Sequence, residues 1–320
     1  MKRKGNLFHK ITSKENLLAS ELKARRGKAY QYGVRIFDKN KEDNINHLHE
    51  MLVSKKYNTS EYTTFTVYEP KERLVYRLPY FPDRITHHAI MNVLEPIFNS
   101  LFTNDTYSCI KGKGIHCASE NLKKALRDQD NTKYCLKLDI VKFYPNVNHD
   151  ILKALLRRKF KDNDLLYLLD EIIDSADGLP IGNYLSQYFA NYYLTYFDIW
   201  IKSDLKIKHY FRYADDVVIL SNDKAHLHAV LAKIKYYLNV NLKLEVKNNY
   251  QVFPVEARGI DFVGYVHYHT HTFLRKSIKK RFAKAVSKKK NKATISAYYG
   301  WAKHCNSKHL LKKILPNEQF

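Results

Sequence analysis

The amino-acid sequence predicts an α+β fold in which a small antiparallel sheet is backed by helices. Two apolar and aromatic stretches have strand character, one at 134–143 and one, a strand-turn-strand, at 209–221. Apolar positions at helical spacing occupy most of the remaining chain, at 14–55, 83–102, 119–127, 149–175 and 223–239. With 320 residues and 45% hydrophobic content, the chain is long enough for one large folded unit or two to three packed subdomains.

Two further segments complete the prediction. Residues 61–80 predict a β-hairpin that turns at 69–72 and brings Lys71, Arg73 and Arg77 close together. Residues 275–317 contain no acid, while 275–292 alone hold ten lysines and arginines. The C-terminal part is therefore predicted to be a separate basic subdomain.

The net charge indicates a polyanionic partner. Lys and Arg number 55 against 32 Asp and Glu, a formal charge of +23, which favours nucleic acid. Charge alone leaves open a non-catalytic ribosomal or chromatin-type protein and a membrane-surface protein. Four cysteines without a CxxC pair predict neither a disulfide framework nor a zinc site. Because the N-terminus lacks the apolar stretch of a signal peptide, we expect a cytoplasmic protein with no membrane partner.

Three carboxylates interrupt the predicted strands. Asp139 lies within 134–143, and Asp215 and Asp216 lie at the centre of 209–221. An uncompensated buried carboxylate is costly, so a cation is expected beside them. Asp-Asp is also a good turn dipeptide, yet two carboxylate-bearing strands in one basic protein favour a shared site. An oxygen-only cluster suits Mg²⁺, with Mn²⁺ as a possible substitute, and two such ions would promote an in-line phosphoryl displacement.

Five segments, in order, resemble the motifs of reverse transcriptases. LKLDIVKFYPNVNH is similar to motif A, GLPIGNYLSQYFANYYLTYFD to motif B and FRYADDVVIL to the YxDD motif C. LNVNLKLEVKNNYQ and GIDFVGY are similar to motifs D and E, and YYGWAKH resembles a thumb segment of bacterial members. The resemblance covers about 60–275 and implies an RNA-directed DNA polymerase with a right-hand fold of fingers, palm and small helical thumb.

The implied division follows the same family pattern. Residues 1–60 would be an N-terminal helical segment and 61–130 the fingers. The palm would span 131–272, with 149–178 inserted as a helical part of the fingers, and 273–320 would form the basic helical thumb.

Within the family, the likeness is closest to the enzymes of diversity-generating retroelements of bacteria and phage. IGNYLSQ matches their IGxxxSQ pattern where retroviral and intron enzymes usually carry QGxxxSP, and KERLVYRLPYFPDRITHHAIMNVLEPIF and TYSCIKGKGIHCA resemble their finger segments. The resemblance implies error-prone cDNA synthesis with adenine mutagenesis. The implied partners are template RNA, primer or cDNA, dNTPs and a small basic accessory variability protein.

Other members of the family remain alternatives. A retron-like or phage-defence reverse transcriptase fits the same palm motifs, as does a non-catalytic RNA-binding relative. A group II intron type is disfavoured, because the sequence printed ends at Phe320 with little room for a maturase and endonuclease extension.

The resemblance also implies roles for individual residues. Asp139 and Asp215 would bind the metal ions directly, with Asp216 as the neighbouring carboxylate. Tyr144 matches the aromatic steric gate that excludes a nucleotide 2′-hydroxyl, although it could be an ordinary core aromatic. Lys71 and Arg73 match the triphosphate-binding cations, for which solvated surface charge is the alternative.

Further positions are expected at the nucleotide and nucleic acid. Ile181 stands where accurate relatives carry glutamine, Gln187 replaces their proline, and Gly182 would allow close approach to the nascent base pair. The predicted nucleic-acid-binding cations of the thumb are Lys279, Lys280, Arg281 and Lys284.

Two features carry no assigned role. In motif D, Tyr250 aligns with the position of a family lysine and Lys247 lies three residues earlier, so no general acid is assigned. The alternating His267, His269 and His271 are expected on a solvent-facing strand side and not at a metal site.

Overall fold

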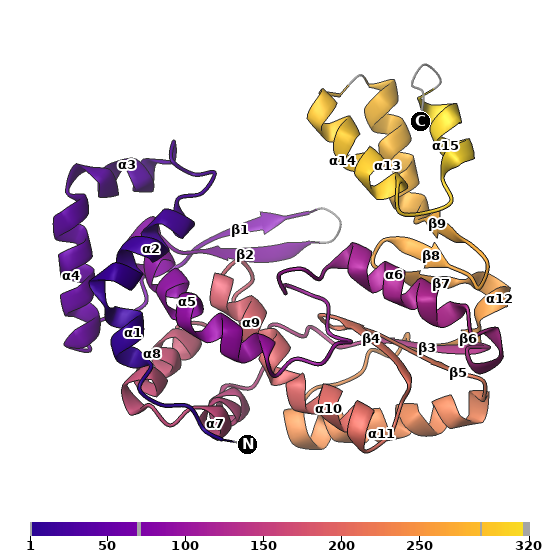
Figure 1. The fold of residues 1–320 in the computed structure, drawn as a ribbon, viewed down its shortest axis with the longest axis horizontal. Coiled ribbons are helices and arrows are strands. Elements are labelled where there is room, and N and C mark those ends of the chain that lie inside the picture. Colours follow the sequence, from indigo (N-terminus) through magenta and orange to yellow (C-terminus); the bar gives the residue numbers. More distant parts are fainter. Residues whose placement is uncertain (1, 69–71, 289, 316–320) are drawn as a thin grey trace. The chain divides into compact units, whose positions relative to one another are not determined.

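The computed structural model describes residues 2–68, 72–288 and 290–315 (Figure 1). Helices and antiparallel sheets are both present, so the α+β prediction is confirmed. The chain forms two compact units, each assembled from separate segments. Unit 1 comprises 1–102, 142–196 and 240–244, and unit 2 comprises 103–141, 197–239 and 245–320.

Unit 1 is mainly helical. Its elements are α1 (Phe8–Thr12), α2 (Lys14–Ala24), α3 (Tyr32–Lys39), α4 (Lys41–Val53), β1 (Thr63–Val67), β2 (Arg73–Arg77), a short helical turn (Tyr80–Arg84), α5 (Ile85–Asn99), α7 (His149–Lys159), α8 (Asn163–Asp174) and α9 (Tyr184–Tyr193). The apolar face of α5 is buried against α2 and α9, and its Ile90, Leu94 and Phe98 are completely inaccessible. Side chains of Asn148 and Asp162 accept hydrogen bonds from the first turns of α7 and α8, which fixes where these helices begin.

The predicted hairpin is present in unit 1. Strands β1 and β2 pair antiparallel, from Thr63 opposite Arg77 to Val67 opposite Arg73. Residues 69–71 of its predicted turn, and therefore Lys71, lie outside the described residues.

Unit 2 contains the main sheet. Its elements are α6 (Ile115–Leu126), a short helical turn (Gln129–Asn131), β3 (Tyr134–Asp139), α10 (Thr195–Ser203, which begins in unit 1), β4 (His209–Tyr213), β5 (Asp216–Ser221), α11 (Lys224–Leu242, which ends in unit 1), β6 (Gln251–Pro254), α12 (Val255–Arg258), β7 (Ile260–Phe262), β8 (Tyr265–His267), β9 (Thr272–Leu274), α13 (Lys276–Ser287), α14 (Lys292–Ala302) and α15 (Lys308–Ile314). Four antiparallel strands form this sheet in the order β4-β5-β3-β6, and β7, β8 and β9 form a second sheet.

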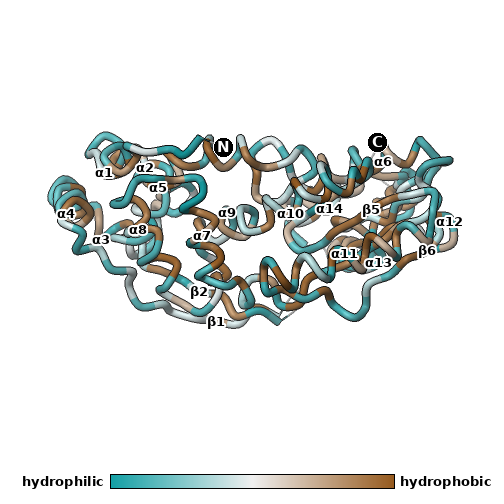
Figure 2. The backbone as a smooth tube through the Cα atoms, turned by 90° about the horizontal axis from the view of Figure 1, so that it is seen from below, coloured by the Kyte–Doolittle hydropathy of each residue, from teal (hydrophilic) through white to brown (hydrophobic). Residues whose placement is uncertain are grey.

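Helices cover both faces of the main sheet. Figure 1 shows α6 on one side and α10 and α11 on the other. Buried residues of α6, including Leu122, pack with Phe211 and Val218 of the sheet. Because both faces are covered, β5 is apolar along most of its length, as its brown colour in Figure 2 shows.

The basic C-terminal helices have a small core of their own. Phe282 of α13, Ala302 of α14 and Leu311 of α15 form a buried cluster with Leu315. The predicted basic helical segment is therefore present, while the four-part division into N-terminal segment, fingers, palm and thumb stays a prediction.

Two predicted boundaries differ from the structure. Strand β3 ends at Asp139 and not at Phe143, because the chain leaves the sheet there and Lys142 adopts a φ of +37°. Helix α6 begins at Ile115, four positions before the predicted start, directly after Gly114 at a φ of +136°. Within the described residues, no helix is long and apolar enough to cross a membrane.

Candidate active site

The three predicted carboxylates meet at one end of the main sheet. Strands β3 and β5 are neighbours, and Asp139 lies directly opposite Asp216 in their register. Asp215 occupies the tight turn between β4 and β5, in which Tyr213 pairs with Asp216. The structure therefore brings Asp139 beside Asp215 and Asp216, which are adjacent to each other but far from Asp139 in the sequence, as predicted.

Burial and mutual repulsion change the acidity of these groups. Burial, and then the hydrogen bond and charge of Asp139, raise the pKa of Asp215 to about 7. Burial also raises the pKa of Asp216 to about 6, although Lys137 opposes the shift. One oxygen of Asp139 and one of Asp216 are buried without a hydrogen-bond partner. The cluster therefore has unused acceptor oxygens and would gain from an added cation.

Two lysines partly compensate the carboxylates. Lys247 Nζ lies 2.8 Å from Asp139 Oδ2, and its backbone N–H donates to the Asp139 carbonyl at 2.8 Å. Lys137 Nζ lies 3.6 Å from Asp216 Oδ2. Lys137 was not among the predicted site residues, although its position two residues before Asp139 places both side chains on the same face of β3. Lys247 was noted only by its offset from Tyr250, and the structure places it at the carboxylates.

The donor atoms fit Mg²⁺. Asp139, Asp215 and Asp216 lie together where β3 ends and β5 begins, and carboxylate oxygens are the ligands that Mg²⁺ prefers. Among the described residues, no group of three or more His, Cys, Asp or Glu side chains forms a complete metal cage. This does not conflict with Mg²⁺, which typically binds one or two protein carboxylates together with water and substrate phosphates.

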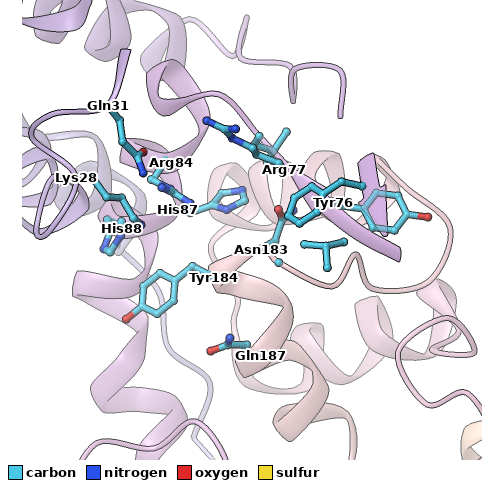
Figure 3. Close-up of a pocket in the computed structure, with 14 residues that line it drawn as sticks. Lys28, Gln31, Tyr76, Arg77, Arg84, His87, His88, Asn183, Tyr184 and Gln187 are labelled. Carbon is cyan, nitrogen blue, oxygen red and sulfur yellow. The ribbon is translucent and has the colours of Figure 1, made fainter. Parts of the chain in front are cut away.

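A cationic cavity in unit 1 contains two of the predicted nucleotide-binding residues. The cavity of about 510 Å³ is lined by Gly182 and Gln187 at α9, and by Lys28, Arg77 and Arg84 (Figure 3). No Asp or Glu is found among the described residues that line it. Burial, followed by repulsion from Arg84, lowers the pKa of Lys28, and burial and then Arg77 lower that of Arg84. The cavity is thus suited to a ligand that carries negative charge.

The start of α9 closely approaches the hairpin. The Tyr76 N–H donates to the Ile181 carbonyl at 2.7 Å, and Gly182 has a φ of +120° with its Cα against the Tyr76 carbonyl. Arg73 is exposed on β2 and Tyr144 is half-buried beside Phe143, and neither is part of the cavity lining. The structure therefore places Gly182 and Gln187 with Arg77, a cation of the predicted hairpin, and with Lys28 and Arg84, which the sequence did not single out.

The predicted nucleic-acid-binding cations lie together on one helix. The four side chains are exposed on α13, while Phe282 and Ala285 of the same helix are buried; the four are Lys279, Lys280, Arg281 and Lys284. The four cations therefore occupy the solvent-facing side of an amphipathic helix.

The prediction for the histidine stretch is wrong at its first position. His267 is fully buried, its Nδ1 lies 3.3 Å from the Thr272 hydroxyl, and burial followed by Lys123 lowers its pKa to about 3. His269 and His271 are only partly exposed. The alternation is that of β8, whose inward side carries Tyr265 and His267.

Known proteins share both the sequence pattern and the fold. Residues 68–267 match the family model described as reverse transcriptase (RNA-dependent DNA polymerase). The chain is 25% identical to Protein YkfC of Escherichia coli over 62% of this chain and 65% of that protein. It is 23% identical to the Retron Ec73 reverse transcriptase of Escherichia coli, over 74% of this chain and 78% of the relative. The solved apo telomerase of Candida tropicalis superposes with a TM-score of 0.50 at 12% identity, over 71% of this chain and 52% of that one.

The fold is that of a right-hand polymerase, as predicted. The family match covers more than half of the chain, so this chain belongs to the reverse transcriptase family of RNA-dependent DNA polymerases. It spans a little under two thirds of Protein YkfC.

Proposed function

We propose that this chain is an active RNA-directed DNA polymerase that copies template RNA into cDNA. The observation that carries the proposal is the meeting of Asp139 with Asp215 and Asp216 at one end of the main sheet of a chain of the reverse transcriptase family. A non-catalytic RNA-binding relative would have no need to retain buried, partly unpaired carboxylates, which destabilise a fold.

The side chains divide the work of the site. Asp139 and Asp215 would hold Mg²⁺ or Mn²⁺, which would activate the primer hydroxyl and stabilise the leaving pyrophosphate when bound. Asp216 stays beside Lys137 as the third carboxylate. The cations of the unit 1 cavity and of α13 would bind phosphates of the nucleic acid and the incoming dNTP. Tyr144 would act as the steric gate, and Lys71 and Arg73 would contact the triphosphate.

Substitution of the two direct ligands tests the proposal. Asp139→Asn and Asp215→Asn should each abolish dNTP incorporation on a primed RNA template with Mg²⁺ or Mn²⁺, since an amide is a weak metal ligand. Asp130→Asn, at an exposed position of unit 2, serves as the matched control and should keep full activity. Circular dichroism would verify that all three variants fold. Full activity in either ligand variant would contradict the two-metal assignment.

We propose further that the enzyme belongs to a diversity-generating retroelement and is error-prone. Support comes from the IGxxxSQ pattern, in which Ile181 offers only van der Waals contact where glutamine could hydrogen-bond around the nascent pair. Loss of one such contact reduces discrimination by about 10- to 100-fold. Restoring it with Ile181→Gln should lower misincorporation opposite template adenines, measured by sequencing the cDNA.

A retron-like enzyme is the second candidate, because the Retron Ec73 reverse transcriptase aligns over most of both chains. Accurate copying by the wild-type protein, with no excess of errors at adenines, would favour this candidate over the first. A small basic accessory protein is a proposed partner only in the first case. Co-expression of a retroelement's accessory protein without co-purification would count against it.

A further inference from the structure

The turn that carries Asp215 is held by a buried arginine. Ala214 adopts a φ of +55°, a region that favours glycine and costs other residues roughly 1–2 kcal/mol. Arg212 Nη1 donates to the Ala214 carbonyl at 3.0 Å. This carbonyl belongs to the peptide group that also contains the Asp215 nitrogen. The hydrogen bond therefore fixes the orientation of the peptide directly before the carboxylate.

Asp198 holds the rest of the same guanidinium. Arg212 Nε donates to Asp198 Oδ1 at 2.7 Å, and Nη2 donates to Oδ2 at 2.5 Å, a bidentate pair. Both side chains are completely inaccessible to solvent. The hydroxyls of Thr106 and Tyr210 donate to the other lone pairs of Asp198, at 2.9 and 2.6 Å. Each carboxylate oxygen thus accepts two hydrogen bonds.

Backbone hydrogen bonds hold Arg212 in register. Its N–H donates to the Asp105 carbonyl at 2.9 Å, and its carbonyl accepts from the Tyr107 N–H at 3.1 Å. The segment 105–107 therefore pairs with β4 on the side away from β5. Movement of the arginine backbone would break both bonds.

Stability alone does not account for this ion pair. Replacing a buried ion pair by apolar residues of similar volume is often neutral or stabilising. An apolar side chain at 212 could fill the space but could not donate to the Ala214 carbonyl. Strained backbone such as that of Ala214 persists where surrounding contacts determine it.

We propose that Arg212, anchored by Asp198, is a positioning residue that orients the Asp215 carboxylate for metal binding. The inference rests on the proposed function, because it requires Asp215 to be a metal ligand. Arg212 itself would touch neither substrate nor metal. Its effect passes through one peptide group.

Mn²⁺ binding to the full chain, followed by electron paramagnetic resonance, tests this role. Arg212→Lys keeps a positive charge beside Asp198, but the compact ammonium lacks the planar fork whose separate nitrogens hold Asp198 bidentately and reach the Ala214 carbonyl. We expect Mn²⁺ affinity to fall about 10-fold or more, the usual effect of losing a residue that orients a ligand. RNA binding without metal should be unchanged. Thr106→Val, which removes a hydrogen bond to Asp198 but not the Ala214 contact, should bind Mn²⁺ like the wild type.

A second variant covers the case in which Arg212→Lys does not fold. The double variant Asp198→Leu/Arg212→Met removes both charges together and should fold, yet bind Mn²⁺ as weakly. A folded variant of either kind with wild-type Mn²⁺ affinity overturns the positioning role. Asp215→Asn separates the two hypotheses. If it loses Mn²⁺ binding while the Arg212 variants keep it, only the positioning role fails; if it also keeps Mn²⁺ binding, the proposed metal site fails.

Discussion

Gly182→Ala should disrupt the contact between the start of α9 and the β2 hairpin strand. An added Cβ would lie 2.4 Å from the Tyr76 carbonyl oxygen and 3.1 Å from Val75 Cγ1. Alanine at the φ of +120° costs about 1–2 kcal/mol. Displacing packed backbone costs a further 1–3 kcal/mol or so. The free energy of unfolding should therefore fall by about 2–5 kcal/mol.

Gly114 provides the matched control. Its φ is +136°, similar to that of Gly182, but a Cβ there would meet nothing within 4 Å. Gly114→Ala should therefore cost only the backbone contribution of about 1–2 kcal/mol. Urea denaturation measures the free energy of unfolding of both variants, provided that their m-values equal that of the wild type. An equal loss of stability in the two variants would refute the reasoning that close approach, and not φ alone, requires glycine at 182.

The same substitution should affect the substrate. Separation of β2 from α9 would break the Tyr76 to Ile181 backbone hydrogen bond and widen the cavity that contains Gln187. The KM for dNTP should then rise in Gly182→Ala under conditions where the protein remains folded. Gly114→Ala should leave this KM unchanged.

Three other perturbations have defined outcomes. The pKa of His267 is about 3 in the folded protein, against an ordinary value of 6.5. As the pH drops below 6.5, the unfolded state therefore binds the proton first, and the free energy of unfolding falls. His267→Gln should reduce the slope of the unfolding free energy against pH by about 1.4 kcal/mol per pH unit, measured by denaturation at pH 4–6.5. An identical slope in the variant and the wild type would mean that His267 does not titrate this way. Tyr144→Ala should admit ribonucleotides about 10-fold more readily than Tyr144→Phe, and equal discrimination would leave Tyr144 a core aromatic. Neutralising the four α13 cations should lower the magnitude of the slope of the logarithm of the RNA-binding constant against the logarithm of the salt concentration by about 0.7 per lost phosphate contact. An unchanged slope would mean that the RNA binds elsewhere.

The carboxylates could be predicted from sequence because their signal is local. An aspartate within an apolar strand is unusual at each position separately, and β3 and β5 do pair so that Asp139 faces Asp216. The strand and helix types followed from hydrophobic period in the same way. The ends of the elements were less predictable. Strand β3, for example, ends shortly before Lys142 takes a left-handed conformation, and no glycine in the sequence marks that position.

Contacts between distant segments could not be predicted in this way. Lys247 reaches Asp139 from a loop, and its sequence position gave no reason to prefer it to other lysines. Asp198 was visible only as an interruption of an apolar run, and Arg212 as a charge in an apolar strand. A buried charge requires a partner, but neither sequence position indicated which residue that partner is. The burial of His267 depends on packing across the second sheet, which alternation alone does not reveal.

The interleaved course of the chain restricts the order in which the protein can mature on the ribosome. Unit 1 includes 240–244, where Leu242 accepts a hydrogen bond from buried Tyr193 at 2.7 Å. Its packing therefore cannot be completed until those residues have been synthesised, long after its first helices emerge. Unit 2 needs 103–141 and 245–320 in the same way. Nascent chains would thus expose apolar surface that is not yet packed for much of translation, and we expect a high dependence on chaperones. For the same reason, neither unit should be obtainable as a single contiguous fragment.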